Sequence, residues 1–187
     1  MIAAHLPVLV VLLPLFGGLL AALSRHNEAA FWIALAASLA TLAAASALAG
    51  QVMAGGPISY RIGGWDPALG IEYRIDAVSA PILLLVAAMG VAAVVYARRS
   101  VTVEIIPERI AWYYTMMLVC LAGLLGMAAS GDAFNIFVFL EISSLSTYTL
   151  IALGRDRRAL LAAYQYLIVG TIGATFYVIG VGLLYLS

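Results

Sequence analysis

Lysine is absent from this sequence, because all nine of its basic residues are arginine. Any mechanism that needs a titratable lysine inside a membrane must therefore take it from another chain. Cysteine and histidine are nearly absent as well. Cys120 stands alone in an apolar run, which excludes a disulfide within the chain, and neither His5 nor His26 has partners at metal-ligand spacing. We expect no metal site and no thiol chemistry.

Charge is equally scarce, at 10% of the residues, and the nine basic residues balance nine acidic ones. This balance excludes the basic surface that a nucleic-acid-binding protein needs. Hydrophobic residues make up 65% of the chain, far more than the surface of a soluble globular domain allows. The main partner predicted from composition is the lipid bilayer.

Six apolar runs are long enough to cross a bilayer as helices, since a hydrocarbon core of about 30 Å needs about 20 residues. The chain is therefore predicted to be an all-α integral membrane protein, a single transmembrane helical domain over residues 1–187. The first run lacks a basic start and is too long for a signal peptide, so we interpret it as a retained helix. The predicted helices cover about 7–24, 30–53, 77–97, 110–129, 133–153 and 160–186.

Arginine favours the cytoplasmic side of short loops, and here it is distributed unevenly. The first, third and fifth connections carry seven arginines, whereas the second and fourth carry only Arg61 and Arg74. With six helices, this difference predicts that both chain ends lie on the outer side. We expect a multi-pass protein of the inner (cytoplasmic) membrane.

The second connection, residues 57–76, departs from the helical pattern. Apolar residues alternate with polar ones around Tyr60 and again around Tyr73, and a turn-rich stretch lies between them. Period two predicts a short β-hairpin on the outer face, with Trp65 near the lipid headgroups. Its simplest interpretation is a structural cap. Pairs of small residues four apart, such as Ala122 with Gly126 and Gly170 with Ala174, predict close helix packing.

One acid stands far from any predicted helix end. Glu141 follows eight residues of the fifth helix and precedes about twelve more, so it lies about 13 Å from the boundary. An ionised carboxylate at that depth costs several kcal/mol without a partner or a hydrated cavity. Burial disfavours the charged form and a cation favours it, so such a carboxyl can take up and release a proton. The alternative is a structural ion pair or hydrogen bond between helices.

Hydroxyl groups accompany this acid. Ser144 and Tyr148 fall within about 60° of Glu141 on the helix, which predicts a short polar file. Ser143, Ser146, Thr147 and Thr149 enrich the same half of the helix in hydroxyls. They suit a hydrated proton path, but serine and threonine in membranes also bond back to carbonyls of their own helix. The sequence leaves both interpretations open.

Three other polar residues are less informative. Asp132 precedes the fifth helix, where it can cap the N-terminus, and Asp76 marks the start of the third. Gln165, in the sixth helix, either extends the polar file from Tyr148 or forms an interfacial hydrogen bond.

A longer pattern of residues runs through the last two helices. It comprises Gly131, Asp132, Phe134, Asn135, Phe137, Phe139 and Glu141, then Arg157, Arg158 and Tyr164 to Leu167 with Gly170. This pattern resembles a known family of antiporter-like membrane subunits, and the hairpin residues from Tyr60 to Asp76 fit as well. The family includes the D subunits of multisubunit sodium/proton antiporters, which are the nearest in pattern, subunits of membrane-bound hydrogenases and the proton-pumping subunits of respiratory complex I.

The resemblance implies that Glu141 belongs to a proton pathway and pairs with a lysine two helices further on, which this sequence lacks. It also implies a parent architecture of about fourteen helices with inverted repeats, of which this chain matches the N-terminal portion. We interpret the chain as a partial or split subunit. A fragment or a shortened paralogue kept for assembly are the other two interpretations.

The resulting hypothesis is a subunit of a cation/proton antiporter or complex-I-like complex, whether a redox-driven translocase or a secondary antiporter. Glu141 is its protonatable site, with Ser144 and Tyr148 in support. It is expected to hold no redox cofactor and not to be an enzyme by itself. Its expected partners are other membrane subunits, including one that supplies the lysine, together with protons and Na⁺. Two alternatives are a scaffold subunit that does not transport and an independent small exporter.

Overall fold

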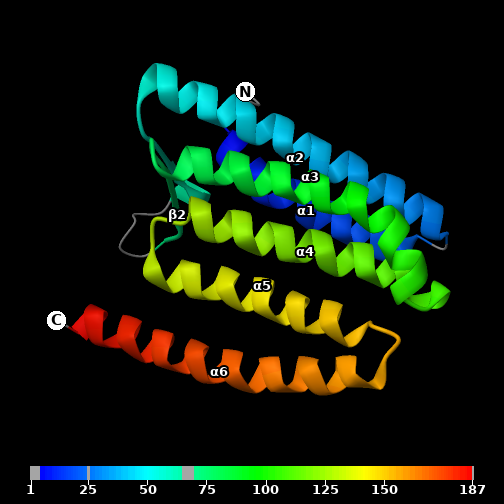
Figure 1. The fold of residues 1–187 in the computed structure, drawn as a ribbon. Helices are drawn as coiled ribbons and strands as arrows, with labels where there is room; N and C mark the ends of the chain where they lie inside the picture. Colours follow the sequence, from blue (N-terminus) through cyan, green and yellow to red (C-terminus); the bar gives the residue numbers. More distant parts are fainter. Residues whose placement is uncertain (1–4, 25, 65–69, 187) are drawn as a thin grey trace.

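A computed structural model describes residues 5–24, 26–64 and 70–186 of the chain (Figure 1). Within them lie six helices that are each long and apolar enough to span a bilayer, which confirms the all-α membrane fold. The chain is thus a multi-pass membrane protein. The helices are α1 (Leu6–Leu23), α2 (Asn27–Gly55), α3 (Ser79–Glu104), α4 (Ile110–Ala129), α5 (Ala133–Ala152) and α6 (Arg157–Leu186).

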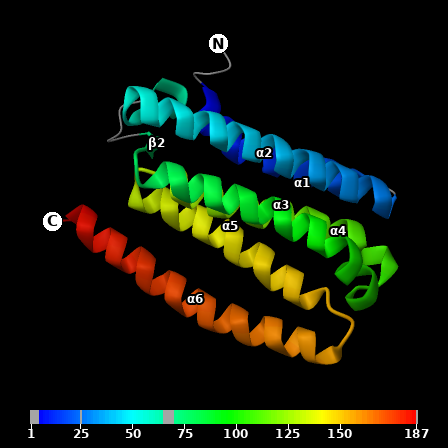
Figure 2. The same ribbon diagram turned by 45° about the horizontal axis from the view of Figure 1, so that its top comes forward.

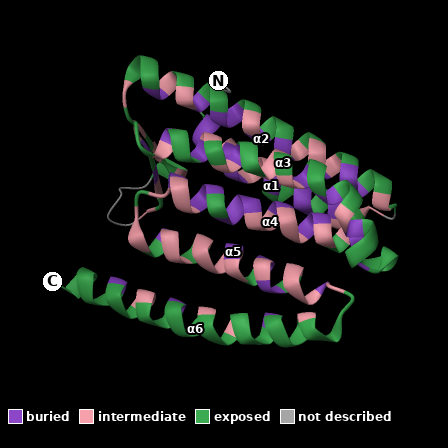
Figure 3. Ribbon diagram, viewed as in Figure 1, coloured by how far each residue is buried: buried purple, intermediate pink, exposed green. Residues whose placement is uncertain are grey.

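Helix α4 lies at the centre of the bundle. It packs against α1, α2, α3 and α5, whereas α6 packs on α5 at the edge of the molecule (Figures 1 and 2). The buried share of the most apolar stretch falls accordingly from 50% in α4 to 22% in α5 and 11% in α6. Figure 3 shows the same gradient, with α6 exposed along most of its length. The core therefore lies among α1 to α4, and the last two helices form its margin.

Small residues allow the first helices to pack closely. Ala30, Ala34 and Ala45 are almost fully buried along α2. Lipid supplies no hydrophobic drive between helices, so close backbone approach is what holds them together. Ser38 and Thr41 are fully buried on the same helix and donate to its own carbonyls at 3.0 and 2.8 Å, so their burial leaves no polar group unsatisfied.

The predicted hairpin is confirmed. Strands β1 (Ile58–Arg61) and β2 (Glu72–Ile75) pair antiparallel, with Ile58 opposite Ile75 and Tyr60 opposite Tyr73. Trp65 lies outside the described residues, so its position at the headgroups stays a prediction, as do the outer-face location and the orientation of the chain.

The hairpin is fastened to two distant parts of the bundle. His5, just before α1, lies within hydrogen-bonding distance of the Tyr60 hydroxyl, at 2.9 Å. Tyr73 pairs with Ser130, and the Gly131 amide donates to the Glu72 carbonyl at 3.0 Å, which joins β2 to the α4–α5 connection. Burial raises the pKa of Tyr73 to about 12, so its hydroxyl stays neutral. These contacts agree with the role of a structural cap.

Helix α3 differs from its predicted end. It continues through Arg98 and Arg99 to Glu104, because charged residues end the apolar span without ending the helix. Val101, beyond them, is 3% exposed and packs in the core. The Arg98 guanidinium lies 4.7 Å from the centre of the Phe31 ring and 3.6 Å from the Glu28 carboxylate, so this charge is accommodated on α2.

The start of α3 is as predicted. The Asp76 carboxylate accepts from the amides of Ser79 and Val78, both at 2.9 Å, and the Ser79 hydroxyl accepts from the Asp76 amide at 2.8 Å. These reciprocal bonds form a capping arrangement. The hydrogen bonds from Ser79 and then Val78 hold the pKa of Asp76 below its usual value. Asp76 is a structural residue.

The close contact of α4 with α5 yields a stability prediction. A Cβ added at Gly123 would lie 2.7 Å from the Ser143 amide nitrogen and 2.9 Å from the Phe139 carbonyl oxygen, both of them backbone atoms. We expect Gly123→Ala to reduce the free energy of unfolding by about 1–3 kcal/mol. The lone Cys120 supports a direct measurement, because a maleimide dye reports its exposure during heating in detergent. Gly180→Ala is the matched control, since its Cβ would meet nothing within 4 Å. The midpoint temperature of thermal unfolding should not fall in this variant. Equal midpoints for the two variants would contradict the close approach.

Candidate functional site

Helix α5 is fixed at its start by Asp132. The carboxylate accepts from the amides of Asn135 at 3.0 Å and Phe134 at 3.3 Å, which confirms the predicted cap. It also accepts a hydrogen bond from the hydroxyl of Tyr185, near the end of α6. Partial burial acts to raise the pKa of Asp132, but the bonds from Tyr185, Asn135 and Phe134 outweigh it and lower the pKa.

Two tyrosines of α6 therefore hold the ends of α5 and α6 together. Besides the Tyr185 bond, the Tyr177 hydroxyl donates to the Ala133 carbonyl at 3.2 Å, and its ring stacks on Phe137 at a centroid distance of 6.2 Å. Sequence reasoning missed these links, because a tyrosine 53 residues from its acceptor gives no local signal. They set which face of α6 meets α5.

Glu141 lies half-buried in the middle of α5, eight residues after its start. Among the described residues it makes neither an ion pair nor a hydrogen bond; the one salt bridge found in that part of the chain joins Arg98 to Glu28. The alternative of a structural ion pair thus finds no partner in the described chain. Glu141 is thus a carboxyl group at mid-helix without an ion-pair or hydrogen-bond partner in the part of the chain that the structure describes.

The structure brings Ser144 and Tyr148 together at a groove between α5 and α6. Its cavity volume is about 370 Å³, and its α6 wall includes Gly170, Gly173 and Ala174. Tyr148 is buried, and its ring meets Tyr166 edge to face at 5.2 Å. Glu141 is not part of the groove lining, although helical spacing places it on the same face of α5.

The hydroxyls of α5 differ in whether they bond to carbonyls of their own helix. Ser146, Thr147 and Thr149 donate to carbonyls of their own helix at 2.6, 2.9 and 2.9 Å, so the structural interpretation holds for them. Ser144 forms no such bond in the part of the chain that the structure describes. Its hydroxyl is therefore free to bind water or a proton carrier in the groove.

A second polar cluster lies on the side of α5 that faces α4. The Cys120 sulfur of α4 lies 3.6 Å from the Ser143 hydroxyl and 3.5 Å from that of Thr147. Sequence reasoning set Cys120 aside because it stands alone in its helix, and its contact with α5 could not be inferred from spacing. Gln165 is exposed on α6 and does not line the groove, so the polar file from Tyr148 does not extend to it.

Comparison with known proteins connects this geometry to a family. No protein-family model matches the chain. The N subunit of NADH-quinone oxidoreductase from Desulforudis audaxviator (strain MP104C) is 47% identical to it over 185 residues. The D subunit of the Na⁺/H⁺ antiporter from Bacillus subtilis (strain 168) is 31% identical over 179 residues. The chain is homologous to the antiporter-like membrane subunits. These alignments cover 97% and 95% of this chain but only 36% of each relative, so the chain spans about a third of their length.

Solved structures support the same relationship. A chain of the membrane-bound sulfane sulfur reductase, an archaeal respiratory membrane complex, superimposes with a TM-score of 0.83 at 32% identity, over 98% of this chain and 37% of that one. A chain of the Mrp complex from Dietzia sp. DQ12-45-1b gives 0.85 at 26% identity, over 99% and 34%. The resemblance seen in the sequence is thereby confirmed.

The groove geometry predicts that the position of the Tyr148 side chain requires a glycine at residue 170. A Cβ at Gly170 would overlap the Tyr148 hydroxyl and lie 2.8 Å from its Cζ, whereas a Cβ at Gly173 would meet nothing within 4 Å. We expect Gly170→Ala to lower the free energy of unfolding by about 1–3 kcal/mol and Gly173→Ala to leave it nearly unchanged. A thermal double-mutant cycle with Tyr148→Ala is the measurement. In the Tyr148→Ala background the penalty at Gly170 should vanish; a penalty that persists there contradicts the contact.

Proposed function

We propose that this chain contributes part of a proton path in a multisubunit cation/proton antiporter or complex-I-like complex, with Glu141 as the protonatable group. The observation that carries the proposal is a half-buried carboxyl at the middle of a membrane-spanning helix, without an ion pair in the described chain, in a homologue of antiporter-like subunits. Ionisable groups placed in this way mark proton relays and ion paths in membrane proteins.

The energetics require a partner for Glu141. An ionised carboxylate near the bilayer centre costs several kcal/mol unless a cation or water compensates it. The chain has no lysine, and its arginines lie toward helix ends and in the connections. We therefore assign the compensating cation, an intramembrane lysine, to another membrane subunit of the assembly.

The exposed side of α6 supports the need for such a partner. Only 11% of its most apolar stretch is buried, and Thr171, Thr175 and Gln165 are exposed on it. Lipid is a poor solvent for an exposed amide, whereas a neighbouring protein helix can hydrogen-bond it.

Ser144 and Tyr148 are proposed to pass protons or to hold the water that does so. Ser144 lies one turn from Glu141, and its hydroxyl has no hydrogen-bond partner among the described residues. Tyr148 follows one turn later in the same groove. Both can donate and accept a hydrogen bond, as a relay requires. The file then runs toward the arginine-rich end, which we propose faces the cytoplasm, with both chain ends on the outer side of the cytoplasmic membrane.

The decisive variant is Glu141→Gln, which keeps the shape of the side chain and removes its ability to ionise. We expect it to reduce H⁺ or Na⁺ transport by at least about tenfold per assembled complex, measured in inverted membrane vesicles with a pH-sensitive dye. Glu141→Asp should retain part of the activity, because the carboxyl survives at a shorter reach. Glu108→Gln, an exposed acid in the α3–α4 connection, is the matched control and should transport normally.

Subunit levels separate the proposal from the scaffold alternative. Complex abundance is measured in the same vesicles by native gel electrophoresis. Normal transport per complex in Glu141→Gln would contradict the proton-path proposal, whatever the level of assembly. If assembly is also poorer, the result supports the scaffold alternative. Transport by this chain alone in proteoliposomes would instead indicate an independent exporter.

A further inference from the structure

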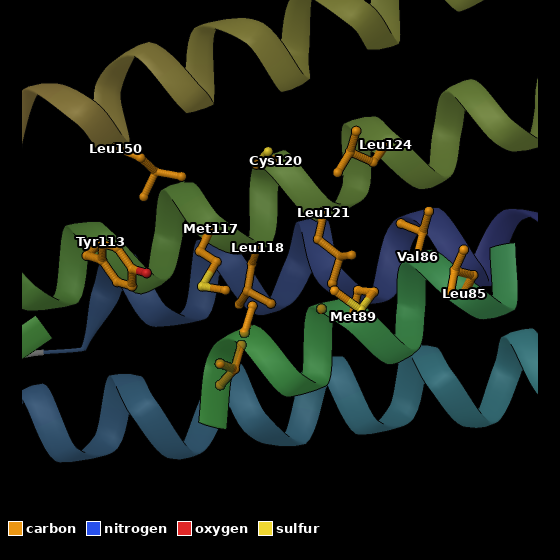
Figure 4. Close-up of a pocket in the computed structure, with 13 residues that line it drawn as sticks. Leu85, Val86, Met89, Tyr113, Met117, Leu118, Cys120, Leu121, Leu124 and Leu150 are labelled. Carbon is orange, nitrogen blue, oxygen red and sulfur yellow. The ribbon is translucent and has the colours of Figure 1, made fainter. Parts of the chain in front are cut away.

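A second groove lies on the other side of α5, between α3 and α5, with α4 as its floor (Figure 4). Its cavity volume is about 420 Å³. It falls in the size range of pockets that hold small molecules, about 300–1,000 Å³. The wall residues Leu85, Met89 and Leu150 and the floor residues Met117, Leu121 and Leu124 are apolar, and Tyr113 and Cys120 supply the polar groups.

The packing of α3 explains the groove. Both α3 and α5 pack on α4. The Leu121 side chain of α4 occupies the space that a side chain at Gly90 of α3 would take. A Cβ added at Gly90 would lie 2.8 Å from each terminal methyl group of Leu121. The floor of the groove therefore contacts α3 closely at Gly90, and the lining continues along α4 to Leu150 of α5. Because the groove opens sideways from a membrane-spanning bundle, its surroundings are hydrocarbon.

The length of the groove fits one lipid chain. Its floor runs from Tyr113 to Leu124, eleven residues further on, which is about 16 Å of helix. This is about half of a hydrocarbon core of about 30 Å, the depth of one leaflet. Water gains little from so apolar a lining, whereas an acyl chain fills it without losing hydrogen bonds.

Charge at the mouth favours an anionic headgroup. Arg109 immediately precedes α4, four residues before Tyr113, which places it beyond the Tyr113 end of the groove floor, toward the headgroup region. It is exposed and has no ion pair within the described residues. The connections at this end of the described bundle carry six arginines against four acids, whereas the hairpin end carries two against three. Those at the first end are Arg98, Arg99, Arg109, Arg155, Arg157 and Arg158, with Glu28, Glu104, Glu108 and Asp156.

We propose that the groove between α3 and α5 binds one acyl chain of an anionic phospholipid, whose phosphate contacts Arg109. The lipid belongs to the leaflet that meets the arginine-rich connections. Phosphate is a good acceptor for a guanidinium, and juxtamembrane basic residues attract anionic lipids. This site is separate from the Glu141 path and does not depend on it.

A photoreactive lipid tests the proposal. The full chain is reconstituted in phosphatidylcholine vesicles with a small fraction of phosphatidylglycerol that carries a diazirine in one acyl chain. After illumination, adducts are mapped by peptide mass spectrometry. We expect labelling of α4 between Tyr113 and Leu124 to exceed that of the exposed face of α6 several-fold. Ala93→Phe, which fills the groove, should abolish the excess, and Ala92→Phe, one residue away on the exposed side of α3, should retain it.

The headgroup is tested in the same assay. Arg109→Gln should remove the preference for the phosphatidylglycerol probe over the matching phosphatidylcholine probe, whereas Arg158→Gln, at the same end but on α6, should preserve it. Size-exclusion chromatography checks that each variant is folded. Even labelling of all exposed helices would show annular lipid only and overturn the site. Unchanged labelling in Ala93→Phe would also overturn the site. So would photo-crosslinking of the native complex if it showed a neighbouring protein, and not lipid, against α4 between Tyr113 and Leu124.

Discussion

The structure depends above all on the close approach of α4 and α5. Lipid provides no hydrophobic drive between helices, so two helices associate through the contacts that small residues allow. At Gly123 the backbones of the two helices come within van der Waals distance, and at Gly126 the Phe139 ring occupies the space of a missing side chain. This contact fixes the rotation of α5 about its axis. That rotation decides which of its polar residues face α4 and which face α6.

The consequence for the site is a helix with two polar sides of different character. Toward α4, Ser143 and Thr147 meet the Cys120 thiol, and the cluster lies between the two helices. Toward α6, Ser144 and Tyr148 open to a groove, and Glu141 lies on that face without a protein partner in the described chain. A rotation of about 100° per residue separates neighbouring positions on a helix, so adjacent serines can serve unlike purposes. The first side holds helices together, and the second is available for chemistry.

Much of this could be predicted from the sequence, because the strongest signals are local. Runs of apolar residues identify helices, period two around Tyr60 and Tyr73 identifies the hairpin, and Asp76 and Asp132 mark helix starts through bonds to amides two or three residues away. Helix α3 ends later than the sequence predicts, because Arg98 and Arg99 mark the edge of the apolar span and not of the helix. Contacts between distant residues were out of reach. The Tyr185 bond to Asp132, the Cys120 cluster and the groove along α4 each depend on how helices pack, which periodicity does not encode.

The length of α6 carries a further consequence. Its 30 residues correspond to about 45 Å of helix, about 15 Å more than the hydrocarbon core is thick. Its C-terminal end is held beside the start of α5 by the Tyr185 bond, so the excess falls toward Arg157. A helix in this situation tilts or bends against the bilayer plane, and its first turns run through the headgroup layer. Arg157 and Arg158 then lie in the headgroup layer, and the bonds from Tyr177 and Tyr185 to the start of α5 couple the position of α5 in the bilayer to that of α6.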